Sequence, residues 1–253
     1  MSDGCSETFF DAHCHIDPIH HCDKIGDINS AAGRLLCGVS PEDWTVVTAV
    51  APHWPGTVAA LGLHPWHAAD AEWNDDVFDR LDGMLSDNPG CWVGEIGLDG
   101  LRTGGEKQEK AFSAQLRLAI RHQRRVNLHC VKAWDALEEM LAREYLSRGG
   151  REGFIIHSFA GPHQSLRRLA GMGAFFTVGP LAWRRASRKQ EERVRLLPLD
   201  RVLLESDAFL VPGVDALDDL RKTLTWLADV RGMAAGDLVT AIDANVRRLT
   251  ADE

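Results

Sequence analysis

The chain has no run of eighteen or more apolar residues, so we expect no transmembrane helix. Its first residues, MSDGCSETFFDAH, lack the basic start and the apolar stretch of a secretory signal, which predicts a cytoplasmic protein. The cysteines contain no CxxC pair and are too widely spaced to form a disulfide-stabilised scaffold, so we expect reduced thiols. They are Cys5, Cys14, Cys22, Cys37, Cys91 and Cys130.

Positive charge is also scarce. The chain carries 37 acidic residues against 28 lysines and arginines, a formal net charge of −9. An acidic protein is poorly suited to holding long duplex DNA by counterion release, but it can still hold one or two phosphates at a metal centre. The charge therefore argues against a broad DNA-binding surface and not against nuclease chemistry.

Short apolar runs alternate along the chain with longer segments of helical period, without repeats or low-complexity linkers. The runs predict eight strands buried on both faces, near 8–13, 34–39, 57–64, 91–97, 125–130, 153–158, 173–179 and 201–207. Helices are predicted at 106–123, 133–147, 162–172, 181–196, 215–231 and 235–249. The alternation predicts a parallel (β/α)8 TIM-like barrel, one domain over residues 1–253, with a doubly wound sheet as the structural alternative.

Histidines and carboxylates stand near the ends of these predicted strands. The carboxyl ends of barrel strands open on one face, so residues far apart in the chain converge there. One histidine after an apolar strand is usually structural, but its repetition on successive strands predicts a metal centre. The residues are His13, His15, His64, Glu95, His129, His157 and Asp207.

The spacing of His13 and His15 is informative because alternate residues of a strand point to the same side. Both imidazoles can then reach one cation, whereas Cys14 faces away. Imidazoles and carboxylates without a thiolate suit zinc, manganese, iron or magnesium. With three or four ligands for each ion, six residues and a solvent bridge would serve two ions.

The motif FFDAHCHID resembles the opening signature of the TatD family of metal-dependent hydrolases. The motifs LGLHPWHA, VGEIGLD, NLHCVKA, IIHSFAG and LLESDAF follow in the family's order, and the resemblance extends from about residue 8 to Asn245. Some relatives in the amidohydrolase superfamily bridge their metals with a carboxylated lysine. Here the comparable strand offers Glu95, which is the TatD-like arrangement.

The resemblance implies a DNA exonuclease with two divalent ions, magnesium, manganese or zinc. One ion would be held by His13, His15, Glu95 and Asp207, and the other by His129, His157 and the bridging Glu95. Glu95 and Asp207 are then the expected catalytic carboxylates, with Asp207 as general base. The residues expected to bind substrate are His64, Trp66 and Lys132. Asp99 and Glu205 are expected to orient the ligands.

Other interpretations remain open. The same metal pair could hydrolyse a small ester, lactone or amide, and the chain could be a subunit of a multi-protein defence or repair system. We expect DNA ends or single strands as substrate, no membrane association, and a monomer or one subunit of a larger complex. A basic run at 184–189 is interpreted as a solvated helix face rather than a nucleic-acid contact. Phe209 and the segment 18–32 depart from the family pattern, which leaves substrate specificity open.

Overall fold

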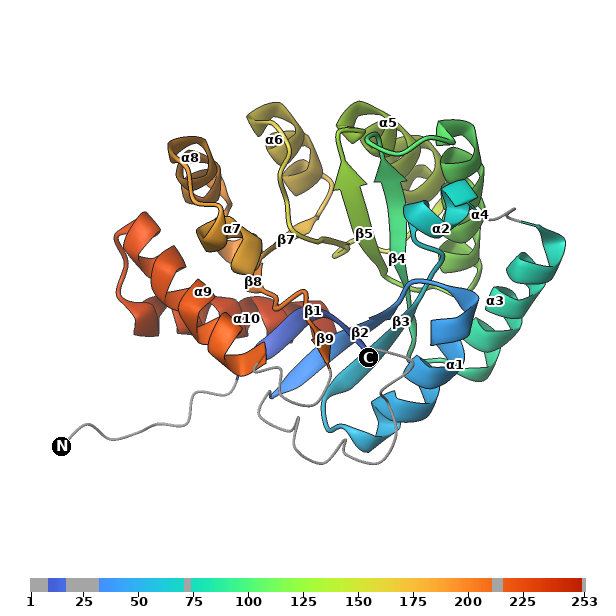
Figure 1. Cartoon of the computed structure of the whole chain (residues 1–253), viewed down its shortest axis with the longest axis horizontal. Helices are drawn as coiled ribbons and strands as arrows, with labels where there is room; N and C mark the ends of the chain where they lie inside the picture. Colours follow the sequence, from blue (N-terminus) through green and yellow to red (C-terminus); the bar gives the residue numbers. More distant parts are fainter. Residues whose placement is uncertain (1–8, 17–31, 71–73, 211–215, 252–253) are drawn as a thin grey trace.

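A computed structural model describes residues 9–16, 32–70, 74–210 and 216–251. Their strands form one parallel sheet, and each strand pairs with its neighbour in chain order from β1 to β8. Helices surround it (Figure 1). The strands are β1 (Phe10–Ile16), β2 (Gly33–Gly38), β3 (Thr57–Leu61), β4 (Trp92–Asp99), β5 (Val126–Val131), β6 (Ile155–Ile156), β7 (Phe175–Val178), β8 (Val202–Leu204) and β9 (Phe209–Leu210).

The sheet closes on itself beyond β8. The chain continues from β8 into β9, which pairs in parallel with β1, and the Asp207 backbone N–H donates to the His13 carbonyl at 3.0 Å. The buried Asp11 carboxylate accepts from the Ser206 N–H at 2.8 Å and from its hydroxyl at 2.6 Å. This nearly closed ring of eight consecutive strands confirms the (β/α)8 barrel, and the doubly wound alternative is wrong.

Most of the predicted helices are present. They are α4 (Gly105–Arg121), α6 (His163–Gly171), α9 (Ala216–Arg231) and α10 (Ala235–Thr250). The helix predicted at 133–147 begins as α5 (Trp134–Met140) but continues as the π-helical η3 (Leu141–Tyr145) and the 3-10 helix η4 (Leu146–Arg148). None of the helices in the described parts of the chain combines the length and apolarity needed to cross a membrane.

The single helix predicted at 181–196 is wrong. The structure has two helices there, α7 (Pro180–Arg184) and α8 (Arg188–Leu196). Ser187 starts the second one, because its hydroxyl accepts a hydrogen bond from the Gln190 N–H at 3.2 Å and so satisfies a free donor of the first turn.

Three helices before β4 were not predicted: α1 (Pro41–Val50), α2 (Pro65–Asp70) and α3 (Asp75–Asp87). Their starts are recognisable in retrospect, because proline occupies the first position of α1 and α2, where its missing N–H costs nothing. The Asn74 side chain caps α3 by accepting from the Val77 N–H at 3.0 Å. Short 3-10 turns, η2 (Ala51–His53) and η5 (Leu199–Arg201), precede β3 and β8.

Two hydrophobic clusters make up the core. The larger cluster packs helices against strands and includes the fully buried Trp44, Phe112 and Tyr145. The smaller includes Cys37 and Phe175. It lies on the side of the strands that carries His13, since the Cys37 thiol lies 3.5 Å from the His13 ring. Burying one large apolar side chain contributes roughly 1.5–3 kcal/mol, so these clusters support the barrel from both sides.

Four cysteines fall in the described residues, and all are buried and free of disulfides: Cys14, Cys37, Cys91 and Cys130. The Cys14 thiol donates to the Leu35 carbonyl at 3.5 Å, within the strand–helix core, as strand parity predicted. Burial raises the pKa of Cys91 to about 11 and that of Cys130 to about 12. Reactive thiolate is therefore scarce among these four cysteines.

A thiol-labelling experiment checks this packing. The double variant C5S/C22S retains only the four buried thiols, which we expect to react with Ellman's reagent on the timescale of unfolding and fully in denaturant. Fast labelling of the folded variant, as fast as that of free cysteine, would contradict the burial described here.

Candidate metal centre

The centre is built around Glu95, which lies within β4 and not at its end as predicted, because β4 continues to Asp99. One carboxylate oxygen, Oε2, lies 3.3 Å from His13 Nε2 and 3.6 Å from His15 Nε2. Both histidines come from β1, and the two rings are on the same side of that strand, as the His-x-His spacing predicted. One oxygen of Glu95 therefore serves the β1 pair.

The other oxygen of Glu95, Oε1, faces a different group of histidines. It lies 2.9 Å from His129 Nδ1, 3.2 Å from His157 Nε2 and 3.3 Å from His64 Nε2. Burial alone would raise the pKa of Glu95, but the surrounding histidines hold it well below its usual value. The carboxylate is therefore ionised and faces two separate sets of imidazoles.

The close approach of Glu95 to its neighbours depends on glycine. Gly97, two residues further along β4, has a φ of +145°, and a Cβ there would lie 2.0 Å from the His129 carbonyl oxygen. No side chain fits at that contact, so the glycine allows β4 and β5 to approach closely enough to bring Glu95 and His129 together.

Hydrogen bonds set which ring nitrogen of each β1 histidine faces the centre. Nδ1 of His13 donates to Asn127 Oδ1 and Nδ1 of His15 to the Cys37 carbonyl, both at 3.0 Å. In the neutral rings Nε2 then carries a lone pair, and the two Nε2 atoms lie only 3.0 Å apart. Two lone pairs this close require a cation, a proton or a metal ion, between or beside them.

His157 is held in a similar way from the other side. Its Nδ1 lies 3.3 Å from Glu205 Oε2, and Glu205 accepts hydrogen bonds of 2.5 Å from the hydroxyls of Ser158 and Thr177. Burial alone would lower the pKa of His157, but Glu95 and Glu205 raise it well above its usual value. Glu205 thus orients the ring so that Nε2 points at Glu95. An orienting role is also what the sequence predicts for Glu205.

His129 differs, because its second nitrogen has no hydrogen-bond partner. Nε2 of this buried ring lies 3.7 Å from Asp99 Oδ2, beyond hydrogen-bond range. Asp99 itself is fixed by the Trp66 indole N–H, which donates to Oδ2 at 2.6 Å, and by Gln108, which accepts from its backbone N–H at 2.7 Å. An unpartnered buried nitrogen is costly, and a bound ligand would satisfy it.

Asp207 forms the open side of the centre. Its carboxylate is 28% exposed, and Oδ1 lies 3.6 Å from His15 Nε2 and 3.9 Å from His13 Nε2. Its backbone is left-handed, with a φ of +50°, which is uncommon for a residue other than glycine. Burial would raise the pKa of Asp207, but the polar contact with the His15 ring and the charge of the nearby histidines lower it to about 2.

These donors suit a divalent cation. Three groups have ligand atoms that all lie within 4.8 Å of one another: His13, His15 and Glu95; His64, Glu95 and His129; and His13, His157 and Glu205. Nitrogen and carboxylate oxygen are the donors that zinc, manganese and related metals accept, and the facing lone pairs of the β1 histidines require positive charge. The Cys14 thiol is absent from all three groups, as strand parity predicted.

The residues expected to bind substrate lie around this centre. His64 contacts Glu95 directly, at a distance similar to those of His129 and His157. Trp66 is the second residue of α2 and is 46% exposed, with the Arg102 guanidinium carbon 4.4 Å from its ring centroid. Lys132 is exposed and follows β5 directly.

Three residues near the centre were not identified from the sequence: Asp11, Cys37 and Asn127. Asn127 precedes His129 by two positions on β5 and therefore faces the same side, which is the signal that could have identified it. Phe209, left open as a departure from the family pattern, is 55% exposed, with its ring centroid 5.1 Å from that of His15. The segment 18–32 lies outside the described residues apart from its last position.

Fold and site together define a class: metal-dependent hydrolases with a histidine and carboxylate centre at one end of a (β/α)8 barrel. The chain belongs to the TatD related DNase family, which matches residues 10–251. It is 32% identical over 238 residues to a 3'-5' ssDNA/RNA exonuclease TatD of Pantoea vagans, covering 86% of this chain and 87% of that one.

Two further comparisons agree. The chain is 34% identical to YjjV of Escherichia coli K12, an uncharacterised metal-dependent hydrolase, over 79% of each chain. The crystal structure of YjjV, a TatD homologue, superposes with a TM-score of 0.78, covering 95% of this chain and 97% of that one at 26% identity. The protein is therefore a metal-dependent hydrolase of this family.

The hydrogen bond from His13 to Asn127 gives a prediction. Asn127→Ala removes the acceptor that orients His13, so we expect metal affinity to fall by roughly 10–100-fold. Competition with a chromophoric chelator measures this. Asn127→Asp keeps an acceptor oxygen at the same place and should retain most of the affinity. Equal affinity of Asn127→Ala and the unaltered protein would show that Asn127 has no such role.

Proposed function

We propose that this protein is a metal-dependent deoxyribonuclease that hydrolyses phosphodiester bonds at the ends of single-stranded DNA or within single strands. The proposal rests on the geometry of Glu95, whose two carboxylate oxygens face two separate sets of histidines. Two sets of ligands that share one carboxylate would suit a pair of divalent ions, which can stabilise the attacking and leaving oxygens of a phosphodiester. The relatives named as ssDNA/RNA exonucleases support the substrate class.

The geometry supports a specific division of ligands. We assign one divalent ion to the Oε2 side of Glu95 and one to its Oε1 side, with magnesium, manganese or zinc as candidates. The first set comprises His13, His15, Glu95 and Asp207, and the second comprises Glu95, His129 and His157. His64 lies as close to Oε1 as His157 does, so it is placed to support the second ion or a substrate phosphate.

When bound, such ions activate water for attack on phosphorus and neutralise the charge that builds on the non-bridging oxygens. Asp207 is the group placed to take the proton of the attacking water, since it is ionised and is the most exposed carboxylate of the centre. Its Oδ1 lies 3.6 Å from His15 Nε2. Lys132 would contact a phosphate and Trp66 a base at the rim.

One assay tests the proposed substrate class. The purified protein is incubated with magnesium, manganese or zinc and either end-labelled single-stranded DNA or p-nitrophenyl esters. We expect metal-dependent shortening of the DNA that chelation abolishes and that is lost in His13→Ala. Ester hydrolysis with intact DNA would instead favour the carbonyl chemistry that the same metal pair could support.

The proposed general base gives a sharper prediction. Asp207→Asn keeps the shape and the backbone hydrogen bond to His13 but removes the basic oxygen, so we expect the turnover number to fall by about 10²–10⁴-fold. Circular dichroism and thermal unfolding should match those of the unaltered protein. Near-normal turnover in this variant would show that Asp207 is not the base.

A further inference from the structure

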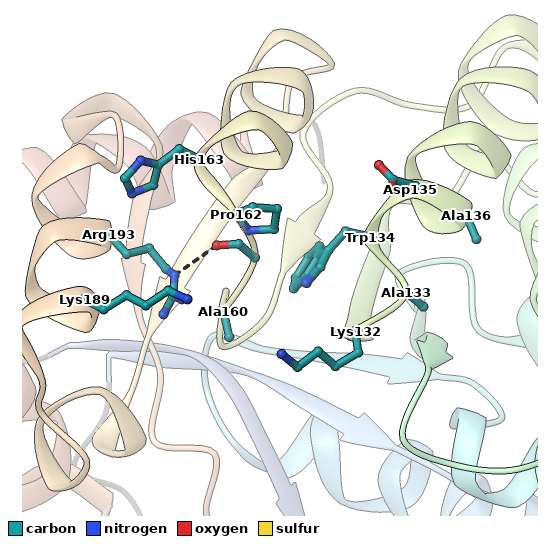
Figure 2. Close-up of a pocket in the computed structure, with 11 residues that line it drawn as sticks. Lys132, Ala133, Trp134, Asp135, Ala136, Ala160, Pro162, His163, Lys189 and Arg193 are labelled. Carbon is teal, nitrogen blue, oxygen red and sulfur yellow. Dashed lines mark hydrogen bonds between the residues drawn. The ribbon is translucent and has the colours of Figure 1, made fainter.

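A hollow lies among the segments that follow β5 and β6 (Figure 2). It has a volume of about 750 Å³ and is lined by the loops that follow β5 and β6 and by one side of α8. Its lining includes Lys132, Trp134, Ala160, His163, Lys189 and Arg193. In Figure 2 the side chains of Lys132 and Lys189 extend into it from opposite walls. None of these residues contributes a ligand atom to the centre described above.

The hollow begins where the metal centre ends. Lys132 follows His129 by three positions and Ala160 follows His157 by three, so the strands that carry two histidines of the centre lead directly into the walls of the hollow. Lys132 has a left-handed backbone, with a φ of +55°. Such conformations are uncommon outside glycine and cluster at functional sites, and this one fixes the direction of the lysine.

The basic residues of α7 and α8 differ in whether they pair with a carboxylate. Arg184 pairs with Asp219 at 2.7 Å and Arg188 with Glu192 at 3.1 Å. Lys189, next to Arg188, lines the hollow, and neither it nor Lys132 pairs with a carboxylate among the described residues. Arg184 and Arg188 thus have the solvated positions predicted for this run, whereas Lys189 is exposed at the hollow.

The one acidic residue that lines the hollow is paired with an arginine. Asp135 is the one carboxylate among the lining residues, and Arg168 donates to its Oδ1 at 2.8 Å. The lining therefore presents unpaired lysines and Arg193 in a chain whose net charge is −9. A polyanion is the chemistry that complements such a lining.

Trp134 supplies an aromatic surface between the two lysines. Its ring packs on Phe159, with centroids 4.9 Å apart, and a Cβ on Gly161 would lie 3.0 Å from its Cδ2 atom. The Arg193 guanidinium donates to the Gly161 carbonyl at 3.0 Å and so holds that loop against the tryptophan (Figure 2). The indole is half-buried, rigidly placed and open to the hollow on one side.

From this arrangement we infer that the hollow binds the part of a single-stranded nucleic acid that continues beyond the bond being cleaved. A base contacts Trp134, while Lys132 and Lys189 each contact a phosphate. Alternating aromatic and cationic contacts are how proteins hold single strands without reading sequence. The inference rests on the proposed nuclease function, because it gives the substrate of that same centre a second point of attachment.

Binding measurements test this separately from cleavage. The ligand is a fluorescein-labelled single strand of about a dozen nucleotides with phosphorothioate linkages, which slow hydrolysis. The dissociation constant is measured by anisotropy at several salt concentrations. Log affinity falls as log salt rises, and each phosphate contact on a single strand contributes about 0.7 to the steepness of this fall. Lys189→Gln should therefore reduce the magnitude of the slope by about 0.7.

Further variants separate charge from stacking. Lys132→Asn removes the charge but keeps a residue that tolerates a left-handed backbone, and it should also lower the slope by about 0.7. Trp134→Ala should weaken binding by roughly tenfold without changing the slope, and Trp134→Phe should restore most of the loss. The matched control is Arg188→Gln, at a position of α8 that does not line the hollow and is 93% exposed, which should leave slope and affinity unchanged.

The outcomes distinguish the two proposals. Salt slopes that are the same in Lys189→Gln, Lys132→Asn and the unaltered protein overturn the strand-binding hollow, even if the unmodified DNA is cleaved. An equal fall of the slope in Arg188→Gln also overturns it, because the effect would then be one of general charge. Lowered slopes in the two lysine variants, with no cleavage of unmodified DNA under any metal, would support the hollow and overturn the nuclease.

Discussion

The ionised carboxylate of Glu95 lies where five imidazoles converge, almost completely shielded from water. Two come from β1, one from β5, one from the residue after β6 and one from the turn before α2. An unpaired charge there would be costly, and the surrounding histidines reduce that cost because each places a ring nitrogen within 3.6 Å of one of the two oxygens. The dependence is mutual. Buried histidines resist protonation, and the carboxylates make positive charge favourable among them, which is the requirement for holding a metal cation.

The same arrangement connects the centre to the barrel itself. Each histidine that faces Glu95 needs its second nitrogen directed elsewhere, and Asn127 on β5 and the Cys37 carbonyl on β2 provide this for the β1 pair. The bonds that close the barrel, from Asp207 to His13 and from Ser206 to Asp11, also place the Asp207 carboxylate beside those rings. Disturbing the closure would therefore disturb the centre.

These connections explain how far sequence reasoning could reach. The strand order and the inward side of His13 and His15 follow from local periods of two and from alternation with helices, so both were predictable. Asn127 was not, because its contact with His13 joins positions 114 apart and depends on the register across the barrel. The break between α7 and α8 was missed because a single capping serine outweighed a continuous helical pattern.

The distribution of charge reconciles an acidic protein with a polyanionic substrate. In physiological salt, electrostatic interactions between exposed charges are largely screened beyond about 8 Å, so the net charge of −9 acts mainly against extended contact with duplex DNA. A strand end that enters the hollow meets local charge instead: Lys132 and Lys189 are free of carboxylate partners among the described residues, while Arg184 and Arg188 are neutralised by Asp219 and Glu192. In the proposed nuclease, an acidic surface that discourages duplex binding and a small cationic hollow after β5 and β6 would together favour single-stranded ends over continuous duplex.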